Sequence, residues 1–86
     1  MRLPPVDASV VIADFDTELV VLVPVLRKAH LLEPMWALLF DSCRQGHDRD
    51  DVVAELAAAA GWTILDTDAW VDGALSELSR LGVTAP

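Results

Sequence analysis

Two apolar runs rich in β-branched residues fill much of the first third of the chain. Residues 10–13 and 19–23 predict strands, because β-branched side chains pack well on a pleated surface. The polar segment 14–18 between them predicts a turn, so the two strands should pair as an antiparallel hairpin. Pro24 ends the second strand, since proline has no N–H to donate to a ladder.

A shorter apolar stretch follows at residues 29–32, after a turn marked by Arg27 and Lys28. It is long enough to return as a third strand beside the second one. We expect this strand to lie at the edge of a small sheet that is open on one side, where part of its backbone is unpaired.

From Pro34 onward the apolar residues recur every three or four positions, which is the period of an amphipathic helix. Pro34 suits the first position of a helix, and Glu33 beside it complements the helix dipole. Gly46 then predicts a left-handed helix end. The side chains expected on the buried face of this helix are Trp36, Leu39, Phe40 and Cys43.

Two further helices are predicted in the second half of the chain. Asp48 is a capping residue for the first of them, which Gly61 should end. The last helix should start near residues 66–67 and stop at Gly82. Their buried positions are expected to be Val52, Val53, Leu56 and Ala60 in the one and Val71, Leu75, Leu78 and Leu81 in the other.

Three strands followed by three helices predict an α+β fold with a winged-helix-like plan. The chain has 86 residues, without an internal repeat, a low-complexity tract or a linker, so residues 1–86 should form a single domain. A chain of this size can build one core, but it is short for a catalytic cleft as well. These features favour a binding module, and we expect no catalytic residues.

Charge and hydropathy narrow the possible partners. Fourteen acidic against six basic residues give a net charge of −8, which repels phosphate backbones, so nucleic acid is not expected as a partner. The longest apolar stretch, residues 19–26, is interrupted by Pro24 and is far shorter than a membrane span. Pro4 and Pro5 stand where a signal peptide would need an apolar helix, so we expect no signal peptide. We expect a soluble, cytoplasmic protein without a membrane partner.

The residues that commonly carry metal or redox chemistry are sparse. Cys43 is the only cysteine, and together with His30 and His47 it lacks the spacing of a metal site. The acidic run at residues 48–51 lacks the alternating ligands and the glycine of a calcium loop, and predicts helix capping. We expect neither a metal nor a cofactor.

The order and spacing of these elements resemble the PqqD-like family of RiPP recognition elements over nearly the whole chain. Residues 20–24 look like the family's apolar strand that ends in proline, and residues 30–33 look like the strand that runs into its first helix. The other matching positions are Leu39, Phe40 and Cys43 in the first helix, Asp48, Val52 and Leu56 in the second, and Val71, Ala74, Leu75, Leu78, Gly82 and Val83 in the last.

This resemblance implies a protein that binds the leader segment of a ribosomally synthesised precursor peptide. It further implies that the protein presents the precursor to a modifying enzyme, such as a radical-SAM enzyme, a protease or a cyclase, and catalyses nothing itself. A lasso-peptide or other RiPP cluster, or a stand-alone PqqD-like chaperone, fits this pattern equally well. Whether the free protein forms a homodimer through its open sheet edge is left open by the sequence.

An exposed edge strand independently supports peptide binding, because an extended peptide can pair with its free N–H and C=O groups. The groove should lie between this strand and the last helix. The residues predicted to bind peptide are Lys28, Ala29, His30, Leu31 and Leu32 on the strand and Trp70, Gly73, Ala74 and Glu77 on the helix.

The tryptophans and the basic pair near the edge strand have more than one interpretation. Trp70 fits the wall of the groove and the margin of the core equally well, whereas Trp36 and Trp62 are predicted to be core residues. Arg27 and Lys28 could steer an acidic leader segment, but two basic residues in a turn are more often simply solvated.

Two alternative functions remain. Asp41 and Ser42 resemble the Asp-Ser pair of an acyl or peptidyl carrier protein, although a carrier serine opens a helix and Ser42 lies inside the helical pattern. A winged-helix protein-interaction module shares the topology. A winged-helix DNA binder does not fit, because its recognition helix would be the strongly acidic segment 48–60.

Overall fold

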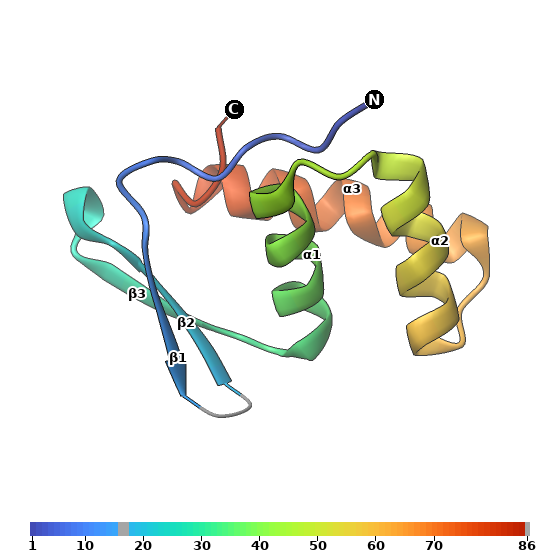
Figure 1. Cartoon of the computed structure of the whole chain (residues 1–86), viewed down its shortest axis with the longest axis horizontal. Coiled ribbons are helices and arrows are strands. Elements are labelled where there is room, and N and C mark those ends of the chain that lie inside the picture. The colour runs from blue at the N-terminus through green and yellow to red at the C-terminus, as the bar shows by residue number, and fades with distance from the viewer. Residues whose placement is uncertain (16–17, 86) are drawn as a thin grey trace.

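The computed structural model describes residues 1–15 and 18–85, which form three strands followed by three helices (Figure 1). This arrangement confirms the predicted α+β fold. In chain order the elements are β1 (Val11–Phe15), β2 (Glu18–Val23), a short 3-10 helix (Pro24–Leu26), β3 (Lys28–Leu32), α1 (Pro34–Gln45), α2 (Arg49–Ala60) and α3 (Ile64–Arg80).

The strands form one antiparallel sheet in the order β1-β2-β3, so β3 lies at an edge as predicted. The strands reach further into the first turn than expected, because Asp14 pairs with Leu19 and Phe15 pairs with Glu18. Residues 16–17 of the predicted turn lie outside the described residues. The turn into β3 is also shorter than predicted.

Arg27 is the residue that connects the 3-10 helix to β3. Its backbone is left-handed, with φ 52°, and its N–H donates to the Pro24 carbonyl, which closes the 3-10 helix. Lys28, predicted to share the turn, is therefore the first residue of β3 and pairs with Val23.

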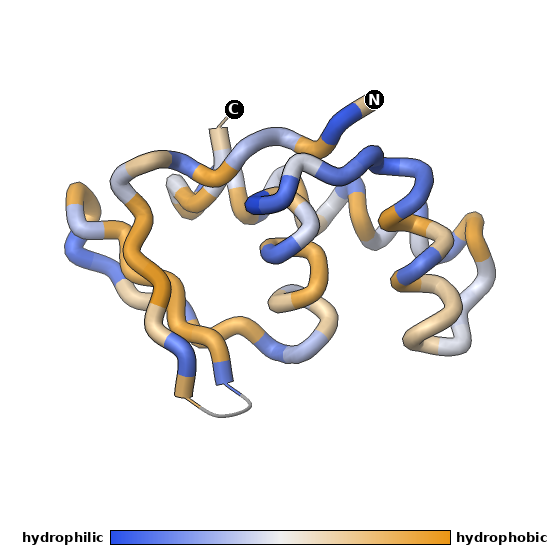
Figure 2. Tube along the Cα trace, in the orientation of Figure 1, coloured by the Kyte–Doolittle hydropathy of each residue, from blue (hydrophilic) through white to orange (hydrophobic). Residues whose placement is uncertain are grey.

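The two faces of the sheet differ in exposure. Alternate residues of β2 (Leu19, Val21 and Val23) are buried against the helices, because successive side chains of a strand point to opposite faces. The other face is also apolar but meets solvent, and Phe15 and Leu31 are 60% and 61% exposed. Figure 2 shows the resulting hydrophobic character of the strands.

Local signals set the ends of the helices. Pro34 opens α1 and Gly46 ends it with φ 71°, as predicted. The Asp48 carboxylate caps α2 by accepting a hydrogen bond from the Asp50 N–H, and Gly61 ends that helix.

The predicted start of α3 is wrong by two residues. The hydroxyl of Thr63 accepts from the Asp66 N–H and starts the helix at Ile64. The sequence pattern did not show this because Ile64 and Leu65 are exposed and add nothing to the buried stripe.

The core lies between the inner face of the sheet and the three helices, with Leu39, Phe40, Leu56 and Leu78 at its centre. Ala60, Leu75 and Leu81, which were predicted to be buried, are only partly so, whereas Ala57 and Ala74 are buried.

The N-terminal segment crosses the helices on one side of the molecule (Figure 1). Leu3 is buried and its N–H donates to the His47 carbonyl, while Val6 bridges to Thr84 near the C-terminal end. Within the described part of the chain, no helix has the length and apolar character needed to cross a membrane.

Candidate functional site

The outer edge of β3 has no partner strand in the described part of the chain. β3 pairs with β2 on one side only, and apart from this ladder residues 28–32 make no backbone hydrogen bond within the described residues. Alternate N–H and C=O groups of an edge strand point away from its neighbour. This edge can therefore accept another extended chain.

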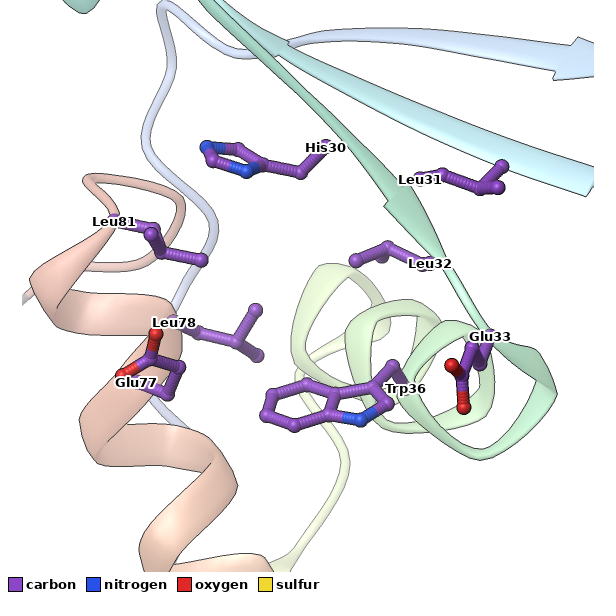
Figure 3. A pocket seen from close by; sticks show the side chains of 8 residues that line it. All are labelled: His30, Leu31, Leu32, Glu33, Trp36, Glu77, Leu78 and Leu81. Atoms are coloured by element: carbon purple, nitrogen blue, oxygen red, sulfur yellow. The ribbon is translucent and has the colours of Figure 1, made fainter.

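A hollow of about 240 Å³ lies beside this edge, between β3, the start of α1 and the last turns of α3 (Figure 3). We call it the apolar hollow. It is lined by His30, Leu31, Leu32, Glu33, Trp36, Glu77, Leu78 and Leu81.

The pleat of β3 decides which of its side chains reach the helices. His30 and Leu32 extend toward Leu78 and Leu81, whereas Leu31 extends to the other side of the strand (Figure 3). The Nε2 atom of His30 is buried and has no hydrogen-bond partner in the described structure. Leu32 is 8% exposed and closes the floor of the hollow.

A second hollow continues along β3 toward the beginning of the strand. It is lined by Leu26, Lys28, His30, Arg80 and Leu81 and has a volume of about 270 Å³. We call it the basic hollow. His30 and Leu81 line both hollows, so the two together form one groove along β3, which we call the β3 groove.

The structure gathers some of the predicted peptide-binding residues and separates others. His30, Leu31, Leu32 and Glu77 line the apolar hollow, and Lys28 lines the basic hollow. Ala29 faces a third hollow next to Leu22 and Arg27.

The other three predicted residues on α3 do not line the β3 groove. Ala74 is 3% exposed and belongs to the core, where it cannot touch a bound peptide. Gly73 is exposed, and Trp70 lines a separate hollow with Trp62 and Asp66.

The three tryptophans form a cluster that explains the position of Trp70. The Trp70 ring packs edge-on against Trp36 and Trp62, with ring centroids 5.4 Å and 5.7 Å apart. Trp36 is partly buried and lines the apolar hollow, so it supplies the aromatic wall that could have come from Trp70. The prediction that Trp62 is a core residue is wrong, because its side chain is 41% exposed.

Four residues that line the apolar hollow were not predicted from the sequence: Glu33, Trp36, Leu78 and Leu81. Two of them could have been predicted from their position in the sequence. Glu33 and Trp36 come shortly after the edge strand, and the first turn of α1 must lie beside the end of that strand. No local signal distinguishes the groove-facing Leu78 and Leu81 from other apolar positions of α3.

Charged side chains mark the rim of the β3 groove. Arg80 donates from its Nε to Glu77 at 2.9 Å and from Nη2 to the other carboxylate oxygen. This pair lowers the pKa of Glu77, mainly through the hydrogen bond from Arg80, with a smaller contribution from nearby His30. Within the described residues, Lys28 and Arg27 make no ion pair.

Side chains with catalytic potential lie elsewhere and are poorly placed for chemistry. Burial raises the pKa of the Cys43 thiol to about 11, so it is not a thiolate at neutral pH.

Ser42 is 8% exposed in the middle of α1, and its hydroxyl donates to the Leu38 carbonyl at 2.9 Å. A carrier serine must be exposed, so the acyl-carrier alternative is wrong. Among the described residues, no group of three or more metal-ligating side chains lies close enough to hold an ion.

Two solved structures share this architecture over nearly the whole chain. One is described as TbiB1 in complex with the TbiA(β) leader peptide, with a TM-score of 0.87, 16% sequence identity and coverage of 94% of both chains. The other is described as lasso peptide synthetase B1 complexed with the leader peptide, with a TM-score of 0.82, 19% identity and coverage of 94% of this chain and 95% of that one. At these identities the likeness establishes a common fold.

No protein-family model and no curated protein matches the chain.

Proposed function

We propose that this protein binds the leader segment of a ribosomally synthesised precursor peptide, which adds as a strand to β3. The observation that carries the proposal is the unpaired edge of β3 beside the β3 groove, on a fold shared with two proteins whose structures contain leader peptides. Backbone pairing supplies affinity in this mode, and side-chain pockets supply specificity.

The apolar hollow suits one apolar side chain of the added strand. Trp36 and Leu81 present carbon surface to it, the fully buried Leu78 lies beneath it, and the free backbone of β3 lies at its margin. Alternate residues of the added strand would point into the groove and away from it. The bound peptide would thus be recognised at every second position.

The proposal makes the protein a PqqD-like delivery module without catalysis of its own. The chemistry would be carried out by a partner enzyme, such as a radical-SAM enzyme, a protease or a cyclase, in a lasso-peptide or related RiPP system. The support for this part is the family resemblance of the sequence together with the shared fold.

A homodimer formed through β3 would use the same backbone groups as the peptide. Peptide binding and dimerisation through this edge are therefore mutually exclusive, and a dimer of this kind would dissociate as the leader is added. Analytical ultracentrifugation of the protein with and without the leader distinguishes the two states.

The test is to remove an outward-pointing N–H of β3 by proline substitution. His30→Pro and Leu31→Pro are made separately, because neighbouring residues of a strand direct their N–H groups to opposite sides. In only one of the two variants is the lost N–H the one that points away from β2. In that variant the hydrogen bonds between β3 and β2 are all kept. We expect that variant to stay folded by circular dichroism and to bind the leader at least about tenfold more weakly.

The binding measurement is a calorimetric titration with synthetic leader peptides, taken from short precursor reading frames that genome sequencing finds near the gene for this protein. The matched controls are Ile12→Pro and Ala13→Pro on β1, the opposite edge of the sheet. A folded β3 variant that binds as tightly as the parent would contradict strand addition at this edge. Equal weakening by a folded β1 variant would place the peptide on the other edge.

A further inference from the structure

Basic side chains gather at one end of the β3 groove although the chain as a whole is strongly acidic. Of the six Lys and Arg residues, Arg27, Lys28 and Arg80 surround the beginning of β3. The net charge of the chain is −8. The local charge at this end of the groove is therefore opposite in sign to the net charge of the chain.

Two of these basic groups face the basic hollow from different elements. Lys28 is on the same face of β3 as His30, because residues two apart in a strand share a face, and Arg80 reaches the hollow from the last turn of α3. The ammonium of Lys28 has three donors and makes no ion pair among the described residues.

Arg80 retains free donors as well. Its Nε and Nη2 atoms bind Glu77, which leaves the N–H groups of Nη1 for another acceptor. The Arg80 side chain is 68% exposed, so a ligand can reach it. Together Lys28 and Arg80 provide more positive charge than the single Glu77 carboxylate neutralises.

The opposite end of the β3 groove has the reverse character. Glu33 is exposed at the far end of the apolar hollow, directly after β3, and the residues that line this hollow include Glu77 and His30 but no Lys or Arg. The groove thus runs from positive charge through an apolar centre to negative charge. A peptide lying along it experiences a different charge at each end.

We infer that the β3 groove selects a peptide with an acidic side chain that enters the basic hollow and an apolar side chain that enters the apolar hollow. This inference rests on the proposed function. Same-face positions of a strand are two apart, so the two side chains should be separated by two or four residues. The acidic residue fixes the register of the added strand, because a shift of one residue turns both side chains away from the groove.

The selectivity for an acidic peptide comes from its attraction to the basic hollow and its repulsion by the acidic remainder of the protein surface. Complementary charges across an interface set specificity and register more than total affinity. An acidic peptide is repelled by most of this surface and attracted at Lys28 and Arg80. The basic pair at the start of β3 is therefore a recognition element, although the sequence alone favoured simple solvation for Lys28.

The inference is tested with a displayed library of random twelve-residue peptides, selected separately on three proteins. These are the parent, the double variant Lys28→Glu/Arg80→Glu, and the control Arg44→Glu. Arg44 is a matched control because it also forms an exposed i,i+3 pair, with Asp41, and does not line the groove. One peptide enriched on the parent is then titrated against all three proteins by fluorescence anisotropy.

We expect the parent and Arg44→Glu to enrich Asp or Glu two or four residues from an apolar residue. The double variant should instead enrich Lys or Arg at that position, and should bind the parent's peptide about tenfold more weakly, with a difference that shrinks at high salt. A parent selection without a fixed acidic position, or a double variant that binds the peptide as the parent does, overturns the inference.

The outcomes also separate the inference from the proposed function. If the enriched peptides carry only apolar positions and lose binding to the folded β3 proline variant, strand addition stands and charge selection fails. If no peptide is enriched on the parent, both fail.

Discussion

At the scale of single residues, Cys43 shows how burial controls reactivity. Its side chain is 2% exposed within the core, and burial raises the thiol pKa from the ordinary 9.0 to about 11. The thiolate is the reactive form of cysteine, so the folded protein keeps this residue protonated and inert at neutral pH. The sequence suggested a buried thiol, and in the structure Cys43 is buried because it lies on the face of α1 that packs into the core.

Cys43 should resist alkylation while the protein is folded. With iodoacetamide at pH 8, mass spectrometry should detect slow modification of the native protein and rapid modification in concentrated urea. A native rate equal to the rate in urea would show that the thiol is accessible.

The same pKa shift gives a pH dependence with a definite sign. The folded state binds the thiol proton more tightly than the unfolded state, so this contribution to stability is complete below pH 9.0 and is lost as the pH rises toward about 11. Relative to Cys43→Ala, which has no thiol, the parent should lose free energy of unfolding over this range in urea titrations. A constant difference between the two proteins would contradict the shift.

At the scale of elements, the two glycines near the end of the chain have opposite roles. Gly73 lies in the middle of α3, where an added methyl group would meet open space. Gly82 has φ 79° just after that helix, and an added Cβ would lie 3.2 Å from the Leu26 side chain. Only the second glycine is required by its backbone conformation.

Alanine substitution should separate these two roles. Gly73→Ala should raise the free energy of unfolding by about 0.5–1 kcal/mol, because alanine is the better helix former. Gly82→Ala should lower it by about 1 kcal/mol or more, since a left-handed backbone is strained for a residue with a side chain. Urea titration followed by circular dichroism measures both. Stabilisation by Gly82→Ala would show that the turn is free to change its conformation.

For the molecule as a whole, Arg49 joins α2 to α3, the next helix in the chain, through residues 19 and 23 positions further on. From the start of α2 its guanidinium donates to the carboxylates of Asp68 and Asp72 on α3, each at 2.6 Å, and to the Asp68 carbonyl at 3.2 Å. The Arg49 side chain is 12% exposed, whereas Asp72 is 71% exposed. The partly buried guanidinium, with three hydrogen bonds, fixes the relative position of α2 and α3.

Removing this guanidinium should destabilise the fold. Arg49→Met should lower the free energy of unfolding by about 1–3 kcal/mol, because it removes charged hydrogen bonds from a partly buried site. The control Arg44→Met, which breaks an exposed pair within one helix, should cost less than about 0.5 kcal/mol. Urea unfolding of both variants gives the comparison, and equal losses would mean that Arg49 contributes no more than a surface ion pair.

Interactions between residues that are close in the chain are enough to specify the kind and order of the elements. The β-branched runs, the helical periodicity, the Asp48 cap and the glycine stops at Gly46 and Gly61 act between residues that are close in the chain. The edge position of β3 was also predictable, because the apolar pattern after residue 33 has the period of helices and predicts no fourth strand. The misplaced start of α3 shows the limit of this reasoning: an exposed first turn leaves no trace in the buried pattern.

The side chains that line the β3 groove are set by contacts between elements that are far apart in the sequence. α3 runs from α2 past α1 toward the sheet (Figure 1), so its last turns reach β3 while Trp70, nearer its start, packs on Trp36 and Trp62. The angle between helix and sheet is set by packing across the core, which no local pattern records. For the same reason Lys28 and Arg80, far apart in the sequence, meet at one hollow only because the chain folds back on itself.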